Sequence, residues 1–151
     1  AICIDGGVLY AAGAEKVSGG RWKGVLWKDG QPTYFTEEVG TEVTGLYVKE
    51  GKYIIEGNMT ADSGDIVTCI WTEEGVQVIS EGMALCQGTG LAVAGSDIYV
   101  AGNAYDMDYD TYEEIYRSPV WKNGTEMALE VVSSDNFTVW GLACAFVDTQ
   151  E

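Results

Sequence analysis

A frame of glycines and tryptophans that occurs three times is the feature that most constrains how this chain folds. The glycines are spaced 44 and 45 residues apart and the tryptophans 44 and 50 apart: Gly13, Gly57 and Gly102, and Trp27, Trp71 and Trp121. Leucine follows a further series of glycines that marks where units begin: Gly45, Gly90 and Gly141. Self-similarity at a period of this length is typical of repeat architectures.

The frame predicts a single repeat domain over residues 1–151. Its units are residues 1–44, 45–89 and 90–140, and residues 141–151 open a fourth unit. The third unit carries an insertion, because 19 residues separate its glycine from its tryptophan where the other two units have 14. The chain opens with Ala1 rather than Met, so we expect a processed chain or an excerpt from a longer one.

Each unit contains four short apolar segments separated by turn residues. Valine, isoleucine, tyrosine and tryptophan dominate these segments, and proline is scarce, which favours strands over helices. The pairs Asp29-Gly30 and Asn123-Gly124 predict tight type I′ hairpins. Longer polar stretches at residues 14–23, 58–65 and 103–118 are predicted to be variable loops.

Four antiparallel strands in each unit of about 45 residues are the plan of a β-propeller blade. We therefore predict an all-β fold, a β-propeller-like arc of about three four-stranded antiparallel blades plus one extra strand. The alternative is a β-trefoil, which also has three four-stranded units. A closed threefold fold does not require the surplus segment that begins at Gly141.

The repeated tryptophans and glycines are predicted to form the structural core of these units. Stacked blades would bury Trp27, Trp71 and Trp121 between neighbours. Because glycine has no Cβ, we expect the backbone to turn sharply or to be approached closely at the three shared glycine positions, Gly13, Gly57 and Gly102.

The segments Asp97–Asn103 and Val120–Gly124 resemble tandem repeats of uncharacterised secreted or surface-anchored bacterial proteins, and more distantly kelch repeats. The kelch double glycine is missing, because Ala14, Asn58 and Asn103 follow the three glycines. The resemblance spans the chain and implies a β-propeller at an extracellular or cell-surface location, with no agreed activity. Complete propellers usually have four to eight blades, so the resemblance also implies an excerpt, an open arc or chains that complete one another's ring.

Charge and composition exclude several classes of function. The net charge of −16 argues against nucleic acid and anionic membranes as partners. No apolar run approaches the roughly 20 residues that span a bilayer, so we expect no membrane insertion. Histidine is absent, which excludes Ser-His-Asp and Cys-His catalysis and disfavours ordinary zinc or haem sites. We expect a protein that is not an enzyme.

Four single cysteines leave both buried free thiols and disulfides open: Cys3, Cys69, Cys86 and Cys144. Cys69 and Cys86 fall within one unit and could bridge neighbouring strands. Three Asn-x-Thr triplets, at Asn58, Asn123 and Asn136, would permit glycosylation in a eukaryotic secretory route.

The insertion in the third unit is the candidate ligand-binding site, since insertions in repeat folds often gather on a binding face. Its candidate residues are Tyr105, Asp106, Asp108, Tyr109, Asp110 and Tyr112. The alternating carboxylates Asp106, Asp108 and Asp110 resemble the opening of a calcium loop, but Thr111 stands where that loop has glycine. Ca²⁺ is the one candidate cofactor, and a solvated acidic loop is the other interpretation.

The leading hypothesis is a non-catalytic extracellular interaction module that binds a protein or glycan through its inter-strand loops. The alternative is a structural repeat unit that self-assembles with other copies into a larger ring or filament, since an unpaired edge strand is a template for another chain. A glycan-active enzyme that uses a carboxylate pair is the third hypothesis.

Overall fold

A computed structural model describes residues 1–80, 85–108 and 110–127. They form thirteen strands and no helix, so the predicted all-β class is confirmed. With no helix among them, the described residues contain no helix that could cross a membrane.

The first unit is a four-stranded antiparallel sheet whose strands follow chain order. Its strands are β1 (Ile2–Asp5), β2 (Val8–Lys16), β3 (Trp22–Lys28) and β4 (Gln31–Val39).

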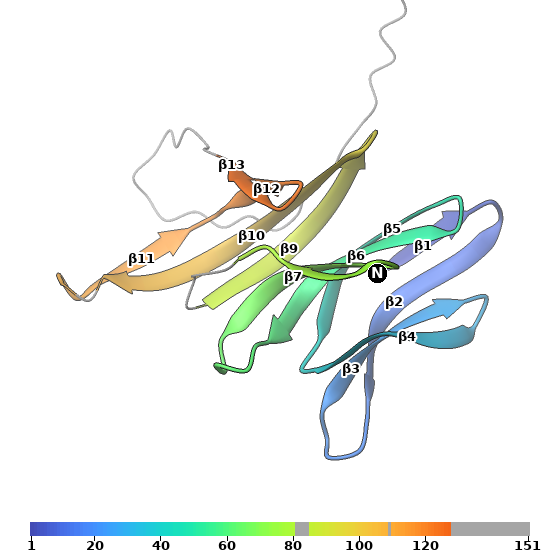
Figure 1. The fold of residues 1–151 in the computed structure, drawn as a ribbon, viewed down its shortest axis with the longest axis horizontal. Coiled ribbons are helices and arrows are strands. Elements are labelled where there is room, and N and C mark those ends of the chain that lie inside the picture. The colour runs from blue at the N-terminus through green and yellow to red at the C-terminus, as the bar shows by residue number, and fades with distance from the viewer. Residues whose placement is uncertain (81–84, 109, 128–151) are drawn as a thin grey trace, which may run out of the picture.

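Two further units of the same connectivity form a nine-stranded sheet. The second unit comprises β5 (Glu42–Lys49), β6 (Lys52–Thr60), β7 (Ile66–Thr72) and β8 (Gly75–Val78). The third comprises β9 (Leu85–Ala94), β10 (Asp97–Asp108), β12 (Val120–Lys122) and β13 (Thr125–Met127), and β11 (Glu113–Arg117) pairs with the far end of β10. A single parallel pair, Ile66 with Leu85, joins the two units. Figure 1 shows the three units following one another across the molecule.

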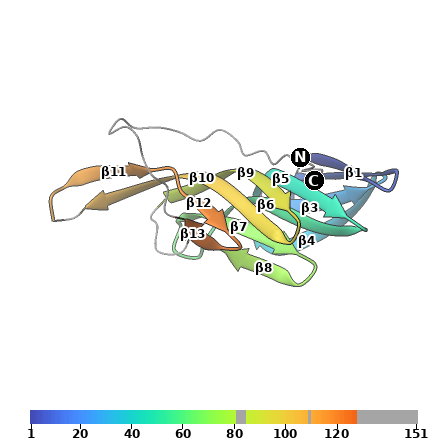
Figure 2. The same cartoon turned by 90° about the horizontal axis from the view of Figure 1, so that it is seen from above.

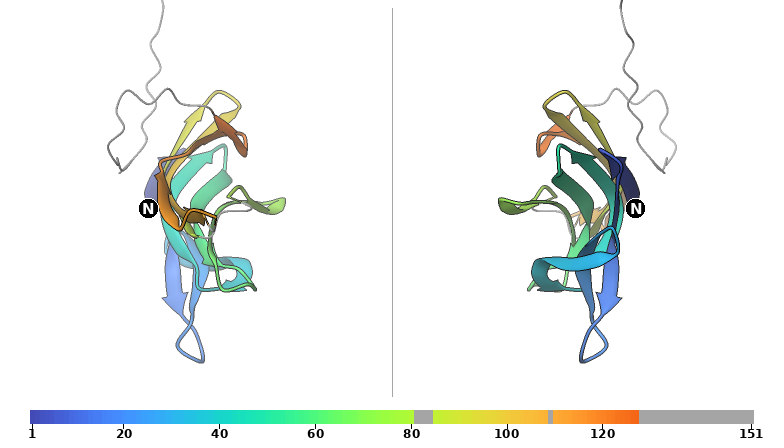
Figure 3. Two further views of the ribbon diagram at one scale, coloured as in Figure 1. Left: turned by 90° about the vertical axis from the view of Figure 1, so that its left-hand side faces the viewer. Right: turned by 90° about the vertical axis from the view of Figure 1, so that its right-hand side faces the viewer.

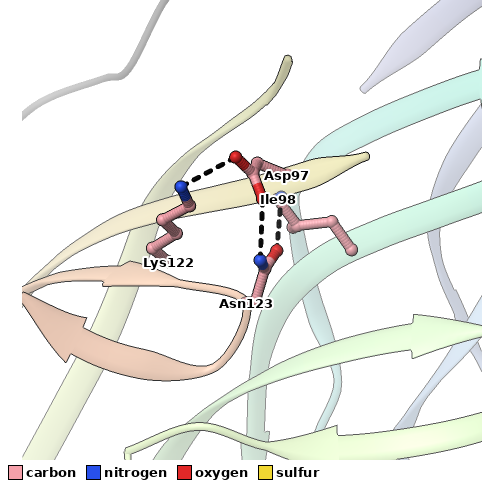
Figure 4. Close-up of polar contacts among 4 residues, drawn as sticks. All are labelled: Asp97, Ile98, Lys122 and Asn123. Carbon is pink, nitrogen blue, oxygen red and sulfur yellow. Dashed lines mark hydrogen bonds and ion pairs between the residues drawn. The ribbon is translucent and has the colours of Figure 1, made fainter. Parts of the chain in front are cut away.

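The hairpin turns form where the sequence predicts them. Asp29 and Gly30 have φ values of 47° and 80°, and Asn123 and Gly124 have 51° and 79°, as type I′ turns require. In the third unit the turn is tied to β10, because the Asn123 side chain accepts a hydrogen bond from the Ile98 N–H at 2.8 Å and donates to Asp97 at 2.9 Å (Figure 4).

The three stretches predicted to be loops are partly strand, at residues 14–16 and 22–23, 58–60, and 103–108 and 113–117. The loop prediction is therefore wrong for most of the third stretch and gives the other two loops too great a length. The second and third strands of each unit continue into these stretches, because their backbones pair with each other instead of with water. The longest continuation is the insertion itself. It forms the β10–β11 hairpin, which is paired from Ala104 with Arg117 to Asp108 with Glu113.

An apolar cluster lies between the first and second units. The first unit contributes Tyr10, Ala12 and Leu26, and the second contributes Val48, Ile55 and Trp71. The ring of Phe35 meets Trp71 edge-on, with ring centroids 5.4 Å apart. A second cluster lies between the second and third units, where Ile70 and Ile79 meet Cys86, Val100 and Trp121.

Each unit therefore has a Trp side, the face that carries its tryptophan, and a reverse side. Trp71 and Trp121 are buried because the Trp side of their unit is turned towards the preceding unit. Trp27 is only partly buried, which differs from the expectation. Trp27 pairs across from Ala11 and so lies on one face of the first sheet, whereas Tyr10 and Ala12 lie on the other. The second unit covers the face that carries Tyr10 and Ala12, which leaves Trp27 without that cover.

Close approach explains two of the three shared glycines. A Cβ on Gly57 would collide with the carbonyl oxygen of Glu42, and a Cβ on Gly102 would lie 2.7 Å from that of Gln87. Both positions lie beside register shifts in the ladder, where an extra residue bends the strand. Gly13 is roomier, because its nearest neighbour is the Trp27 ring at 3.5 Å.

Candidate functional site

The insertion predicted as the binding site is a hairpin that projects from one end of the molecule (Figure 2). It exists because β10 runs for 12 residues, well beyond the three-residue β12 that pairs with its first half. The second half of β10 pairs instead with β11 on one side and with the start of β9 on the other.

One face of this hairpin carries aromatic and apolar side chains. Tyr105 and Tyr116 are directly paired across the strands, with ring centroids 5.3 Å apart. Met107 follows on the same face by strand alternation, and Leu85 adjoins from β9. The Tyr116 hydroxyl donates a hydrogen bond to Glu114 at 3.0 Å, and this bond to the carboxylate raises the pKa of Tyr116. We call these residues, Leu85, Tyr105, Met107 and Tyr116, the tyrosine face.

The tip of the hairpin is held by one carboxylate. Asp108 accepts hydrogen bonds from the N–H groups of Asp110 at 2.8 Å and Thr111 at 3.2 Å, which lower the pKa of Asp108. Tyr112, with φ of 59°, completes the turn with its ring exposed. Tyr109 lies outside the described residues.

The calcium prediction gains no support from this geometry. Asp108 is engaged by the turn, and the carboxylate of Asp106 accepts a hydrogen bond from the N–H of Met107 at 2.8 Å. The residues that the structure describes include no group of three acidic or cysteine side chains placed to hold a metal ion.

A second polar site, which the sequence analysis missed, lies where the second and third units meet. Glu56 is fully buried there. Thr44 donates a hydrogen bond to its Oε2 at 2.5 Å, and its Oε1 has no hydrogen-bond partner. Burial raises the pKa of Glu56 to about 7. The Thr44 hydrogen bond opposes this rise, and the charge of Glu42 adds to it. A carboxyl in this setting holds its proton up to about pH 7, well above the range in which an exposed glutamate loses it.

Glycines make the space that Glu56 occupies. A Cβ on Gly88 would collide with Glu56 Oε1, and one on Gly45 would lie 3.0 Å from Glu56 Oε2. The position was recognisable from the sequence, because Glu56, Ala12 and Ala101 each precede the shared glycine of their unit. An acid that replaces a repeated alanine inside an apolar strand was the signal.

Hydrogen-bonded polar groups continue from Glu56. Asn58 is buried and binds the backbone of Gly88 twice, accepting from its N–H at 2.7 Å and donating to its C=O at 3.3 Å. Ser80 Oγ accepts from the Thr68 N–H at 2.8 Å. A cleft of about 260 Å³ opens beside them, lined by Glu42, Thr44, Asn58, Gln87, Gly88 and Thr89. Burial of Asn58 also leaves the first glycosylation triplet no accessible acceptor.

The three described cysteines are free thiols, and Cys144 lies outside the described residues. Cys69 belongs to the cluster between the first and second units and Cys86 to the cluster between the second and third. The two thiols thus lie on opposite sides of the second unit, which rules out the bridge considered from the sequence. Burial raises the pKa of both, that of Cys69 to about 12.

Comparisons of the chain with protein-family models, with curated proteins and with solved structures found no match. The resemblance to bacterial surface repeats and to kelch repeats stays a prediction.

Proposed function

We propose that this protein is a non-catalytic interaction module that binds a partner protein through the tyrosine face of the β10–β11 hairpin. The observation that carries the proposal is the Tyr105–Tyr116 pair, held 5.3 Å apart on a hairpin that projects from the stacked units (Figure 2). Tyrosine gives large contact area at a low cost in side-chain entropy, which is why it is enriched at protein interfaces.

Charge indicates the chemistry of the partner. Acidic side chains surround the tyrosine face on the same hairpin: Asp106, Asp108, Asp110, Glu113 and Glu114. The whole chain carries a net charge of −16. Complementary charge accelerates encounter and disfavours like-charged partners, so the partner is expected to present basic and apolar groups together.

The three units are proposed to be blades of a propeller-like arc. Face-to-face stacking, with Trp71 and Trp121 each turned towards the preceding unit, supports this arrangement over the β-trefoil alternative. The extracellular or cell-surface location implied by the resemblance is part of the same proposal. Glu56 has the raised pKa of a general acid, but its full burial keeps it from contact with a glycan, so it does not support the glycan-active alternative.

The test is a binding screen against purified basic peptides, neutral peptides and an array of glycans. The chain should bind peptides that combine arginine or lysine with aromatic residues, and added salt should weaken this binding. Replacing Tyr105 and Tyr116 by serine should abolish the binding.

Tyr34 provides the matched control, because it is a half-exposed tyrosine in the first unit, away from the hairpin. Tyr34→Ser should leave peptide binding unchanged. Selective binding of glycans would instead favour the other ligand class, and equal losses in both variants would contradict a site on the hairpin.

A further inference from the structure

The Trp side of the first unit is apolar. Its β1–β2 part is exposed, although Val25 on the same face is fully buried. Ile2, Ile4 and Leu9 are 77%, 73% and 48% exposed, and Trp27 beside them is only partly buried. These side chains share one face, because Ile2 pairs across from Ala11, Ile4 from Leu9, and Trp27 from Ala11. Figure 3 (right) looks onto the end of the molecule where this unit lies.

The same positions are covered in the other two units. Strand pairing equates Ile4 with Val48, which is 5% exposed, and Trp27 with Trp71 and Trp121, which are each 1% exposed. In both cases the cover is the reverse side of the preceding unit. The first unit thus carries the residues of a covered face without its cover.

The reverse side of the third unit repeats the residues of such a junction, although Ala101 on it is fully buried. Tyr99, Ala101 and Val120 occupy the positions that Tyr10, Ala12 and Leu26 occupy in the first unit. The lysine above the tyrosine ring is also repeated between the two units. Lys122 Nζ lies 5.5 Å from the centroid of Tyr99, and Lys28 Nζ lies 5.6 Å from that of Tyr10.

This surface is also held rigidly. Lys122 Nζ forms an ion pair with Asp97 Oδ2 at 2.7 Å, and Asn123 bonds both Asp97 and the Ile98 N–H (Figure 4). These contacts fix the β12–β13 hairpin, and with it Val120 and its cross-strand partner Met127, beside β10.

We propose that the Trp side of the first unit docks onto the reverse side of the third unit of a second copy of this chain. Within one copy, the reverse side of the first unit already packs against the Trp side of the second unit. The proposed contact repeats this junction between two copies. Because the two faces differ and lie at opposite ends of the stack, the contact is head-to-tail. It builds a ring if it closes and a filament if it does not.

A second copy is favoured over an unrelated partner because the chain itself supplies both halves of a junction that it already makes. The negative charge of the chain also predicts how the association depends on salt. Two copies that each carry a charge of −16 repel one another, so association through these apolar faces should strengthen as salt rises. The hairpin proposal predicts the opposite salt dependence, which keeps the two proposals separable.

Two double variants test the contact by sedimentation equilibrium. The first, Ile2→Lys with Ile4→Lys, blocks the Trp side of the first unit and changes only exposed side chains. The second, Tyr99→Lys with Met127→Lys, blocks the reverse side of the third unit. Val76→Lys with Ile115→Lys makes the same charge change at exposed apolar residues outside both faces.

The unaltered chain and the control pair are expected to form species larger than dimers as concentration rises towards about 1 mM, where even weak contacts of millimolar Kd are populated. Each blocked variant alone should remain monomeric, with association weakened roughly 30-fold or more, as for loss of a central interface contact. An equimolar mixture of the two blocked variants should form a dimer and nothing larger, since each supplies the face that the other lacks.

Circular dichroism of each variant confirms folding, and Leu9→Lys with Tyr34→Lys provides a second Trp-side variant. A chain that stays monomeric at the highest concentration and salt would overturn the proposal. So would failure of the two folded variants to form the mixed dimer, or self-association of either one through two like faces.

Discussion

The two junctions between units pair the same two sides of a unit but bury different kinds of side chain. Between the first and second units the filling is apolar, with Ala12 facing Trp71 and its neighbours. Between the second and third units Glu56 occupies the position equivalent to Ala12, and Asn58 and Thr68 are buried near it. Stacked sheets therefore do not require an apolar seam. A polar junction also holds where most of its groups are hydrogen-bonded, although Glu56 Oε1 has no partner. The raised pKa of Glu56 makes this junction depend on pH.

The largest expected effect is at the apolar junction. Trp71→Ala should lower the free energy of unfolding by about 3–5 kcal/mol, because a fully buried indole leaves a cavity. Trp27→Ala, at the same position of the first unit, should cost about 1 kcal/mol or less, because Trp27 is partly exposed. Urea unfolding of both variants measures the difference. Equal losses in the free energy of unfolding would contradict the conclusion that a neighbouring unit covers Trp71 but not Trp27.

The polar junction should weaken as pH rises. Glu56 has a pKa of about 7 in the folded protein against 4.5 as its ordinary value, so the folded state holds a proton that the unfolded chain releases between these values. Stability from this group is complete below pH 4.5 and falls by about 3 kcal/mol as pH rises through 7.

Glu56→Gln isolates this contribution from that of the other carboxyl groups. The glutamine variant should match the unaltered chain near pH 4.5 and exceed it by about 3 kcal/mol at pH 8, as measured by urea unfolding. Parallel pH profiles for the two proteins would show that Glu56 does not titrate in this range.

Alanine substitutions at the shared glycines should have intermediate effects on the free energy of unfolding, and these effects should differ between units. Gly57→Ala should cost about 2 kcal/mol, because its Cβ would meet the rigid carbonyl of Glu42. Gly13→Ala should be tolerated within about 1 kcal/mol, because its Cβ would meet the Trp27 ring at an ordinary 3.5 Å. Thermal melts of the two variants rank them, and a reversed order would contradict the strand register at Gly57.

Loss of one hydrogen-bonding member of the polar junction is expected to have a smaller effect than the changes at Trp71 and Glu56. Asn58→Ala should cost about 1–2 kcal/mol, since the Gly88 N–H loses its acceptor inside the protein. Loss of this bond should also speed hydrogen exchange of the Gly88 amide. An unchanged exchange rate would show that Asn58 does not hold the start of β9.

The four strands common to each unit and the turn chemistry could be predicted because they depend on neighbouring residues, whereas β11 was not predicted. Asn123-Gly124 and Asp29-Gly30 adopt positive φ for local steric reasons, and alternating apolar residues form strands. The length of β10 could not be predicted in the same way. Its acidic second half has no strand pattern of its own, and pairing with β11 stabilises it.

The candidate site could likewise be predicted from the sequence only where its residues depend on local pattern. The sequence pointed to Tyr105 and Tyr112 but not to Tyr116, because the partner across a hairpin depends on register. Glu56 differed visibly from Ala12 and Ala101, yet its burial and raised pKa arise only when the third unit closes over it.

By itself, the sequence determined an all-β chain of similar four-stranded units, because strand propensity, tight turns and a repeated Trp frame are local or periodic properties. Only the tertiary structure decided which face of each unit is covered. Trp27 and Trp71 occupy equivalent positions in their units, and what separates them is whether a neighbouring sheet lies against the ring.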